Sequence, residues 1–433
     1  MIKIENIGTL EEFELKGLHR RSEALAWDKD DVVRSIIDAV KMDGNDAIFE
    51  YTRKFDGVDL DAKKIKVSQK EFDTALSRVG QDYIDAIKLI IGRLTTYHEM
   101  QLPRSFEFDL SDGVSVGREW SSIERVGLYV PGGKAPYASA CYMLGVPAKV
   151  AGCKRVVICS PPNKDGEINP HILASAYLSG VTEVYKVGGA QAIAGLAYGT
   201  ETIPRVNKIF GPGNVYVTAA KLMVIQDVAI DMPAGPSEAM IISDGCTKAS
   251  YVAADILSQA EHDPNSASIL LTTSESEAKA VLREVMIQLD SLDRKEIAAA
   301  SLQQFGRIIV CPDITVCLEI ANFYAPEHLQ LLTENCDDQV KEIRNCGSVC
   351  VGMYSPVAFG DYVCGTNNVI PTGGATKMYS PTHTESFMKS MQTQRVTLSG
   401  LASLIEPLKL IAEQEGFGAH YNSVKIRFDD YEC

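Results

Sequence analysis

The stretch VGLYVPGG, residues 126–133, decides the fold class of this 433-residue chain. Its first five residues favour a β-strand, and the Pro-Gly-Gly turn leads into an apolar segment with helical character at about 137–152. A strand followed by a helix of this length is typical of a βαβ unit, in which helices cover a parallel sheet. The residues that follow repeat the pattern.

The strand–helix alternation forms two series. The first predicts further strands at 155–160, 183–187, 208–210 and 228–231, and helices at 170–179, 190–198 and 214–225. After Met232-Pro-Ala-Gly-Pro236, the second predicts strands at 239–243, 268–272, 307–311 and 348–351, and helices at 248–262, 275–291 and about 314–324. The sequence therefore predicts an α/β protein with two doubly wound parallel sheets.

The two ends of the chain have a different texture. Residues 1 to about 110 look mainly helical, with apolar residues at helical spacing in 30–55 and 71–102. The tail from about residue 376 contains a predicted helix at 404–414 and ends in a strand-like segment at 423–428.

Composition and charge exclude several classes of protein. The net charge of −15 argues against a nucleic-acid partner, because proteins that bind nucleic acid usually present a basic face. No run of about 18 apolar residues predicts a transmembrane helix. The N-terminus lacks the pattern of a secretory signal peptide, so we expect a cytoplasmic protein. The 11 cysteines form no C-x-x-C pair, which argues against a structural zinc site made of cysteines.

Three glycine-rich turns follow predicted strands of the first series. They are Pro131-Gly132-Gly133, Gly188-Gly189-Ala190-Gln191 and Gly211-Pro212-Gly213-Asn214. Parallel sheets bind ligands beyond the carboxyl ends of their strands, and the free N–H groups of helix N-termini attract anions. The turns therefore indicate a nucleotide or cofactor crevice. The alternative is that they only make tight connections, since neither G-x-G-x-x-G nor G-x-x-x-x-G-K-[ST] occurs.

Gln259 and His262 are the first candidates for a metal site. They lie three residues apart in Ser258-Gln-Ala-Glu-His-Asp-Pro264, at the end of a predicted helix, and therefore share one helix face. Asp361 and His420 could add a carboxylate and a second imidazole. Such a mixed nitrogen and oxygen set suits a borderline cation such as zinc. Taken alone, each of the four is more often a surface, turn or capping residue, and spacing does not show that they converge.

The pair Glu327-His328, directly after Pro326, is the best candidate for proton transfer. Histidine titrates near neutral pH, and an adjacent carboxylate can tune the imidazole or act on a substrate proton itself. The alternative is a loop histidine that caps a helix. Glu415 has a similar default interpretation as a solvated carboxylate at a helix end.

A series of motifs, in order along nearly the whole chain, resembles the histidinol dehydrogenase family. The match is strongest from about residue 120 to 375. Its motifs are Val126–Lys134, Val187–Gln191, Phe210–Val217, Ala234–Ser237, Ser258–Pro264, Ala325–Leu329, Gly360–Tyr362, Gly365–Asn367 with Pro371–Thr372, and Ala419–His420.

The resemblance implies a homodimer that depends on NAD+ and on one Zn2+ per subunit and completes histidine biosynthesis. In that family L-histidinol is oxidised to L-histidinal and then to L-histidine, with reduction of two NAD+.

Carried onto this chain, the catalytic residues would be Glu327 and His328: His328 would take the hydroxyl proton, and Glu327 would activate water for the second oxidation. The zinc ligands would be Gln259, His262, Asp361 and His420. The NAD+ contacts would be Tyr129, Gln191 and Asn214. The substrate contacts would be Ser237, Gln259, His262, His328, Asp361, Glu415 and His420.

The resemblance also implies a division into domains. Residues 1–25 would form a helical N-terminal arm, and residues 129–238 an incomplete Rossmann-like domain for NAD+. Residues 26–128 and 239–375 would form a larger α/β domain with the metal and catalytic residues. Residues 376–433 would be a swapped tail, which brings Glu415 and His420 to the site of the partner subunit.

Two segments depart from the family pattern and leave the substrate open. Asn368 stands where the family usually has histidine, and the segment 379–385 differs from the usual run. One alternative is therefore a related NAD-dependent dehydrogenase of another small polar alcohol, such as sulfopropanediol. A second alternative is a zinc hydrolase in which Glu327 activates water. Glu415 and the Ala419-His420 pair favour histidinol.

Overall fold

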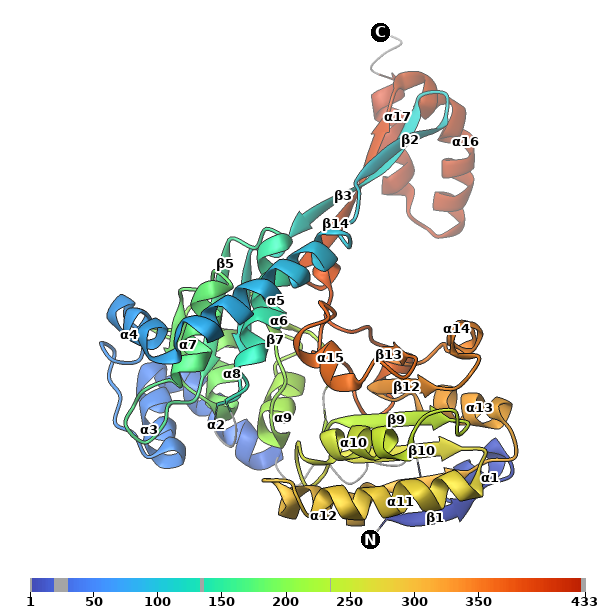
Figure 1. Cartoon of the computed structure of the whole chain (residues 1–433). Helices are drawn as coiled ribbons and strands as arrows, with labels where there is room; N and C mark the ends of the chain where they lie inside the picture. The colour runs from blue at the N-terminus through green and yellow to red at the C-terminus, as the bar shows by residue number, and fades with distance from the viewer. Residues whose placement is uncertain (1, 19–29, 133–135, 234, 430–433) are drawn as a thin grey trace.

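The computed structural model describes residues 2–18, 30–132, 136–233 and 235–429. Its largest sheet, which we call sheet A, is entirely parallel. In spatial order its strands are β1 (Lys3–Asn6), β11 (Arg307–Val310), β10 (Ala267–Thr272), β9 (Glu238–Ser243), β12 (His328–Leu332) and β13 (Ser348–Val351). This sheet forms the lower part of the molecule in Figure 1.

Sheet B is the second parallel sheet. Its strands, in spatial order, are β6 (Val184–Lys186), β5 (Arg155–Ser160), β4 (Arg125–Tyr129), β7 (Lys208–Phe210) and β8 (Ala229–Ile230). The stretch that decides the fold class thus supplies β4 at the centre of sheet B, where both faces are buried. Strands that are buried on both faces become continuous apolar runs, which is why they could be located from the sequence.

Helices cover both faces of each sheet. One face of sheet B carries α2 (Asp30–Asp43), α3 (Asn45–Asp56), α8 (Gly189–Tyr198) and α9 (Val215–Met223). Its other face carries α4 (Gln69–Val79), α5 (Gln81–Glu99), α6 (Ala138–Val150) and α7 (Pro170–Leu178). Sheet A packs against α10 (Ala249–Ala260), α11 (Glu275–Leu289) and α12 (Lys295–Phe305) on one face, and α1 (Leu10–Leu15) and α13 (Ile314–Tyr324) on the other. The predicted α/β class with two doubly wound sheets is confirmed. None of the described helices combines the length and apolar character that a membrane span requires.

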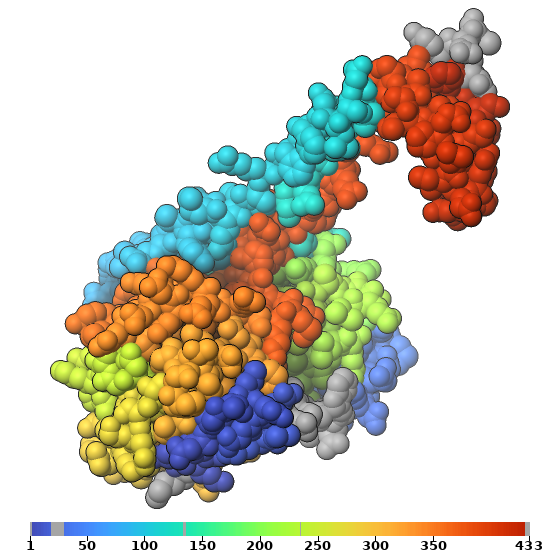
Figure 2. Space-filling model, turned by 90° about the vertical axis from the view of Figure 1, so that its right-hand side faces the viewer, coloured from blue at the N-terminus to red at the C-terminus, as the bar shows by residue number. Residues whose placement is uncertain are grey.

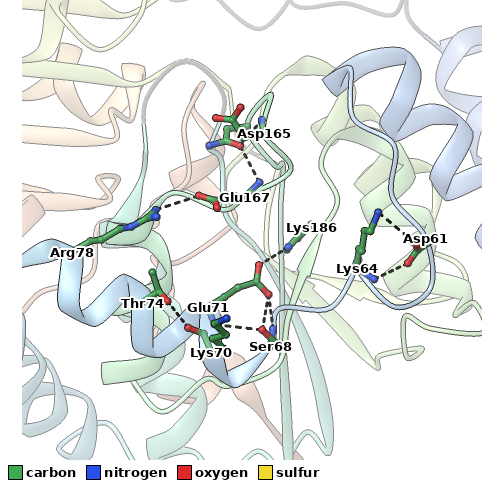
Figure 3. Close-up of polar contacts among 11 residues, drawn as sticks. Asp61, Lys64, Ser68, Lys70, Glu71, Thr74, Arg78, Asp165, Glu167 and Lys186 are labelled. Atoms are coloured by element: carbon green, nitrogen blue, oxygen red, sulfur yellow. Dashed lines mark hydrogen bonds and ion pairs between the residues drawn. The ribbon is translucent and has the colours of Figure 1, made fainter.

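The helices of residues 30–99 pack on sheet B, although the expected domain division groups them with residues 239–375. An amphipathic helix carries no signal for which of two neighbouring sheets it covers, and this explains the difference. The ion pair between Lys186 of β6 and Glu71 of α4 helps to fix this packing, and Glu71 also caps α4 through Ser68 (Figure 3). The expected end of an N-terminal arm, near residue 25, lies outside the described residues.

An antiparallel arm extends from the two sheets. It consists of β2 (Phe106–Ser111), β3 (Val114–Ser122) and β14 (Met388–Val396), and it carries the hairpin of α16 (Leu398–Gln414) and α17 (Gly418–Asp429) at its far end (Figures 1 and 2). The prediction of a strand at 423–428 is wrong, because this segment belongs to α17 and packs along α16. A short alternation of apolar residues does not distinguish a strand from an amphipathic helix turn.

Several short elements lie between β12 and the last strand of the arm. They are α14 (Cys336–Gln339), η2 (Val340–Glu342), α15 (Val357–Tyr362), η3 (Ala375–Lys377) and η4 (Thr384–Phe387). A stacked aromatic pair, Phe387 of η4 and Phe210 of β7, joins the base of the arm to sheet B with ring centroids 3.9 Å apart. The chain thus returns from sheet A across the end of sheet B before it enters the arm.

Candidate active site

Sheet A brings three candidate side chains together at the amino ends of its strands. His328 is the first residue of β12, which lies between β9 and β13. Its Nε2 atom lies 3.8 Å from Glu327 Oε1 and 3.6 Å from Asp361 Oδ1. Glu327 and His328 are buried, and Asp361 of α15 is mostly buried. Sequence analysis missed β12, because polar His328 and Gln330 interrupt its apolar run.

The backbone fixes the orientation of Glu327. The Glu238 N–H group, at the start of β9, donates to Glu327 Oε2 at 2.8 Å. The other carboxylate oxygen, Oε1, is the one that faces His328. The first residues of two neighbouring strands therefore hold a carboxylate against an imidazole without help from a flexible loop.

The turn that follows α10 adds His262 to this cluster, and Gln259 lies in the last turn of the helix before it. His262 is close enough to His328 for its charge to influence the pKa of that residue. Gln259 is 2% exposed, and its Nε2 atom has no hydrogen-bond partner among the described residues. A buried donor without a partner costs about 1–3 kcal/mol, so a bound ligand is expected to satisfy it.

Burial controls the protonation of the cluster. It raises the pKa of the Asp361 carboxyl to about 7. It lowers the pKa of His328 to about 3, and the charge of His262 acts in the same direction. Burial also lowers the pKa of His262; Glu261 opposes this shift and Arg294 adds to it. Both imidazoles are therefore neutral at pH 7, which is the form that ligates a metal or accepts a proton.

Sequence analysis missed a polar layer beneath these residues. Asp255 precedes Gln259 by four residues, so the two share one face of α10, and His262 follows two residues after the helix ends. Burial raises the pKa of Asp255 to about 6, and a hydrogen bond from Gln330 opposes the shift. Gln330 Nε2 also donates to Ser355 O at 3.3 Å. A carboxylate at this spacing in an otherwise apolar helix is a signal that could have revealed Asp255.

The three residues expected to contact NAD+ lie at the carboxyl edge of sheet B. Tyr129 ends β4, and its hydroxyl accepts a hydrogen bond of 3.2 Å from the Gly189 N–H. Gln191 is 1% exposed, and its Oε1 atom has no partner among the described residues. Asn214 caps α9, because its Oδ1 accepts from the N–H groups of Tyr216 at 3.0 Å and Val217 at 3.2 Å. Gly133 of the first glycine turn lies outside the described residues.

A short connection joins this edge of sheet B to the edge of sheet A that carries the candidate residues. The chain leaves β8 at Ile230 and starts β9 at Glu238. Ser237, in the connection, accepts from the Ala267 N–H at 3.0 Å and so lies beside the start of β10. Tyr137, which follows the β4 turn, interacts electrostatically with Arg294 and Asp263 near the end of α10. The carboxyl edge of one sheet thus meets the amino edge of the other.

The two tail residues do not join this cluster within one chain. Glu415 ends α16 and His420 lies in α17, at the far end of the arm from α10 and α15 (Figure 1). His420 is exposed, and its ring packs on Phe417 with centroids 5.1 Å apart. In the described part of the chain, no three His, Cys, Asp or Glu side chains form a group that could hold a metal ion.

Comparisons with known proteins identify the family. The family model described as histidinol dehydrogenase matches residues 19–428. The chain belongs to the histidinol dehydrogenase family. A histidinol dehydrogenase of Methanosarcina mazei is 42% identical over 98% of this chain and 97% of its own length. One from Clostridium acetobutylicum is 45% identical over 92% of this chain and 91% of its own length. The crystal structure of histidinol dehydrogenase from Elizabethkingia anophelis has a TM-score of 0.94 and 40% identity, and covers 100% of this chain and 99% of that chain.

Within this family framework, the departure at Asn368 lies next to the candidate site. Asn368 Nδ2 donates to the backbone oxygen of Asp361 at 3.1 Å. The residue therefore supports the end of α15, which carries the Asp361 carboxylate. The Asn368 side chain contacts the backbone of Asp361 and so helps to position that residue. The effect of Asn368 on the choice of substrate is a separate question.

Proposed function

We propose that this chain oxidises L-histidinol through L-histidinal to L-histidine and reduces two NAD+. The observation that carries the proposal is the contact of His328 Nε2 with the Glu327 and Asp361 carboxylates, in a chain of the histidinol dehydrogenase family. A neutral imidazole held within reach of a substrate hydroxyl can accept its proton, and burial keeps His328 in this neutral form.

The proposed zinc ligands fit a divalent cation. Asp361 supplies a carboxylate whose pKa is raised by burial, and His262 supplies a neutral imidazole. Gln259 supplies a buried amide, whose oxygen is the atom that could bind a cation. His420 of a second copy would complete the set of nitrogen and oxygen donors, which is typical of a catalytic zinc site. When bound, zinc would hold the nitrogen atoms of the substrate and so orient the alcohol carbon.

The protein groups divide the proton transfers between them. In the first oxidation, His328 Nε2 takes the hydroxyl proton while the hydride leaves for NAD+. In the second, Glu327 activates a water molecule that adds to the aldehyde, and His328 accepts a proton again. The Oε2 of Glu327 is anchored by the Glu238 N–H and its Oε1 faces His328, which suits this role because the carboxylate keeps one oxygen aimed at the reacting centre. Each such group typically contributes about 10²–10⁴-fold in rate.

The dinucleotide would lie along the carboxyl edge of sheet B. Tyr129, Gln191 and Asn214 are the proposed contacts, and the unsatisfied Gln191 Oε1 supports a ligand there. We further propose that the NAD-binding part includes the helices of residues 30–99, because they pack on this sheet. The tail, residues 376–433, would bring Glu415 and His420 to the substrate in the partner subunit.

The test is the stoichiometry of NADH formation. The purified protein is supplied with limiting L-histidinol, and with sulfopropanediol in a parallel reaction, with and without a zinc chelator. The proposal expects two NADH per L-histidinol and loss of activity with the chelator. Faster NADH formation from sulfopropanediol would favour the related dehydrogenase. A metal-dependent hydrolysis without any NADH would favour the zinc hydrolase.

A further inference from the structure

A buried ion pair lies beside the proposed dinucleotide edge of sheet B. Lys221 belongs to α9, and Asp231 follows β8 directly. The Lys221 ammonium contacts the Asp231 carboxylate, and the two side chains are 4% and 2% exposed. Ion pairs are rarely buried this deeply, because both charges lose their hydration. The burial of Lys221 and Asp231 therefore suggests that the pair has a role in addition to their mutual attraction.

Both partners of this pair also bind the backbone of Gly211. The Gly211 N–H donates to Asp231 Oδ2 at 2.7 Å, and Lys221 Nζ donates to Gly211 O at 3.0 Å. Lys221 Nζ also donates to Met232 O at 3.4 Å, and the Met232 N–H donates to Asp231 Oδ1 at 2.7 Å. The ion pair thus fixes both the backbone N–H and the backbone oxygen of Gly211.

Gly211 needs this support because its backbone is unusual. Its φ angle is +119°, and a Cβ atom at this position would lie 2.1 Å from the backbone oxygen of Tyr129. Glycine can adopt many backbone conformations, and the ion pair limits this residue to one of them. Three residues later Asn214 caps α9, so the conformation of Gly211 sets where this cap and the start of the helix lie.

We propose that Lys221 and Asp231 are positioning residues for NAD+, which act through the turn of residues 211–214. They do not touch the dinucleotide; they hold the turn so that Asn214 and the N-terminus of α9 meet it in one geometry. This inference rests on the proposed use of NAD+, and it adds residues that are outside the set of direct contacts.

A second ion pair on the same sheet provides a matched control. Lys186 and Glu71 also form a contact in which the lysine is buried, with side chains 8% and 32% exposed. Their partners lie in α4 and its cap, as Figure 3 shows, and include Ser68 but no atom of residues 211–214. Removal of this pair should therefore lower the stability of the protein without weakening its binding of the dinucleotide.

The experiment compares two double variants of the full-length protein with the wild type. Lys221→Met/Asp231→Leu removes both charges together, so no unpaired buried charge remains, and Lys186→Met/Glu71→Leu is the control. The main measurement is the dissociation constant of NADH, from its fluorescence in the absence of substrate. We expect about tenfold weaker binding in the first variant, since removal of a group that orients a direct ligand contact typically costs tenfold or more. The control should bind NADH as tightly as the wild type.

Two further measurements separate positioning from general destabilisation. The KM for NAD+ should rise with little change in kcat or in the KM for L-histidinol. Lys221→Gln/Asp231→Asn, which keeps a donor and an acceptor for Gly211, should restore most of the affinity.

NADH binding equal to wild type in a folded Lys221→Met/Asp231→Leu protein, or an equal loss in the control, would overturn the inference. If that variant does not fold, Lys221→Met alone is measured, which removes the donor to Gly211 O and Met232 O, and unchanged NADH binding there overturns it too. A wild-type protein that binds no NADH would overturn the proposed function together with this inference.

Discussion

The two parallel sheets share one architecture but contribute opposite edges to the junction between them. Sheet B contributes the carboxyl ends of β4, β6 and β7, where glycine turns lead into helix N-termini. Sheet A contributes the amino ends of β9 and β12, where Glu238, Glu327 and His328 meet. One edge offers backbone N–H groups and small side chains, and the other offers buried ionisable groups.

This difference shows how a single fold class can supply two kinds of site. Carboxyl edges of parallel sheets suit phosphate-containing ligands, because helix N-termini point toward them. Helix N-termini do not point toward the amino edge of a parallel sheet. The chemistry at this edge of sheet A comes instead from side chains that the strands hold at fixed distances. Substitutions at the two edges should therefore have different consequences.

The largest effect is expected at the sheet A edge, from His328→Asn. This change removes the proposed proton acceptor and keeps a polar side chain of similar size. The kcat for the first oxidation of L-histidinol should fall by about 10²–10⁴-fold. NADH formation under saturating substrate measures this fall, and His171→Asn on the exposed surface of α7 is the control. A fall no larger than that of the control would remove His328 from the mechanism.

Glu327→Gln should affect one half of the reaction only. The amide keeps the hydrogen bond from the Glu238 N–H but cannot activate water. Oxidation of L-histidinal should slow by about 10²–10³-fold, while oxidation of L-histidinol continues nearly unchanged. Separate single-turnover assays with the alcohol and the aldehyde measure the two steps. Equal losses in both would contradict the assignment of Glu327 to the second oxidation.

His98, in α5 of the sheet B region, contacts the segment that follows α15. It is fully buried; its Nδ1 pairs with Gln101 Oε1 at 2.9 Å, and its Nε2 lies 3.3 Å from the side-chain amide nitrogen of Asn367. Burial lowers the pKa of His98 from 6.5 to about 4; the hydrogen bond with Gln101 opposes this shift, and His383 adds to it. The folded protein therefore keeps His98 neutral where the unfolded chain would bind a proton.

The stability that His98 contributes should be complete above pH 6.5 and fall as the pH drops toward 4. The unfolded state binds more protons in this range, so acid favours unfolding, by up to about 3 kcal/mol from this one group. Urea unfolding at several pH values measures the free energy of unfolding. His98→Gln, which does not titrate, should flatten the pH dependence. An identical dependence in the variant would show that other groups cause it.

The smallest expected effect concerns the sheet B edge and the variant Gly211→Ala. Its new methyl group would clash with the Tyr129 backbone oxygen, so the turn must shift. We expect a loss of about 1–3 kcal/mol in stability, together with weaker NADH binding. Gly57→Ala is the matched control, since Gly57 also has a positive φ, of 71°, but has free space around it. Similar NADH affinity in both variants would argue against a role of the Gly211 turn in cofactor binding.

The sequence located the buried strands well and the exposed or polar elements poorly. Strands such as 155–160 and 208–210 coincide with the structure, because burial on both faces produces apolar runs with clear ends. By contrast β12 was missed, because two of its five residues are polar and serve the site. The arm strands β2, β3 and β14 were missed as well, since most of their side chains are exposed.

The candidate site shows the same limit. Local motifs identified Glu327, His328 and the pair Gln259 and His262, but their convergence depends on strand order, which no local pattern encodes. Asp255 and Gln330 were missed because each alone resembles an ordinary polar residue. The ion pair of Lys221 and Asp231 was equally invisible, because the reason for it is the backbone of Gly211.

The most direct test of the account concerns the separation of His420 from His328 within one chain. If each site takes His328 from one subunit and His420 from the other, the homodimers of His328→Asn and of His420→Asn are both inactive. When the two variants are unfolded together and refolded as a mixture, half of the sites in each mixed dimer contain both native histidines. Activity should then return to about a quarter of the wild-type value, for random pairing in a two-fold symmetric dimer. No recovery of activity in a mixture that contains mixed dimers would contradict the account.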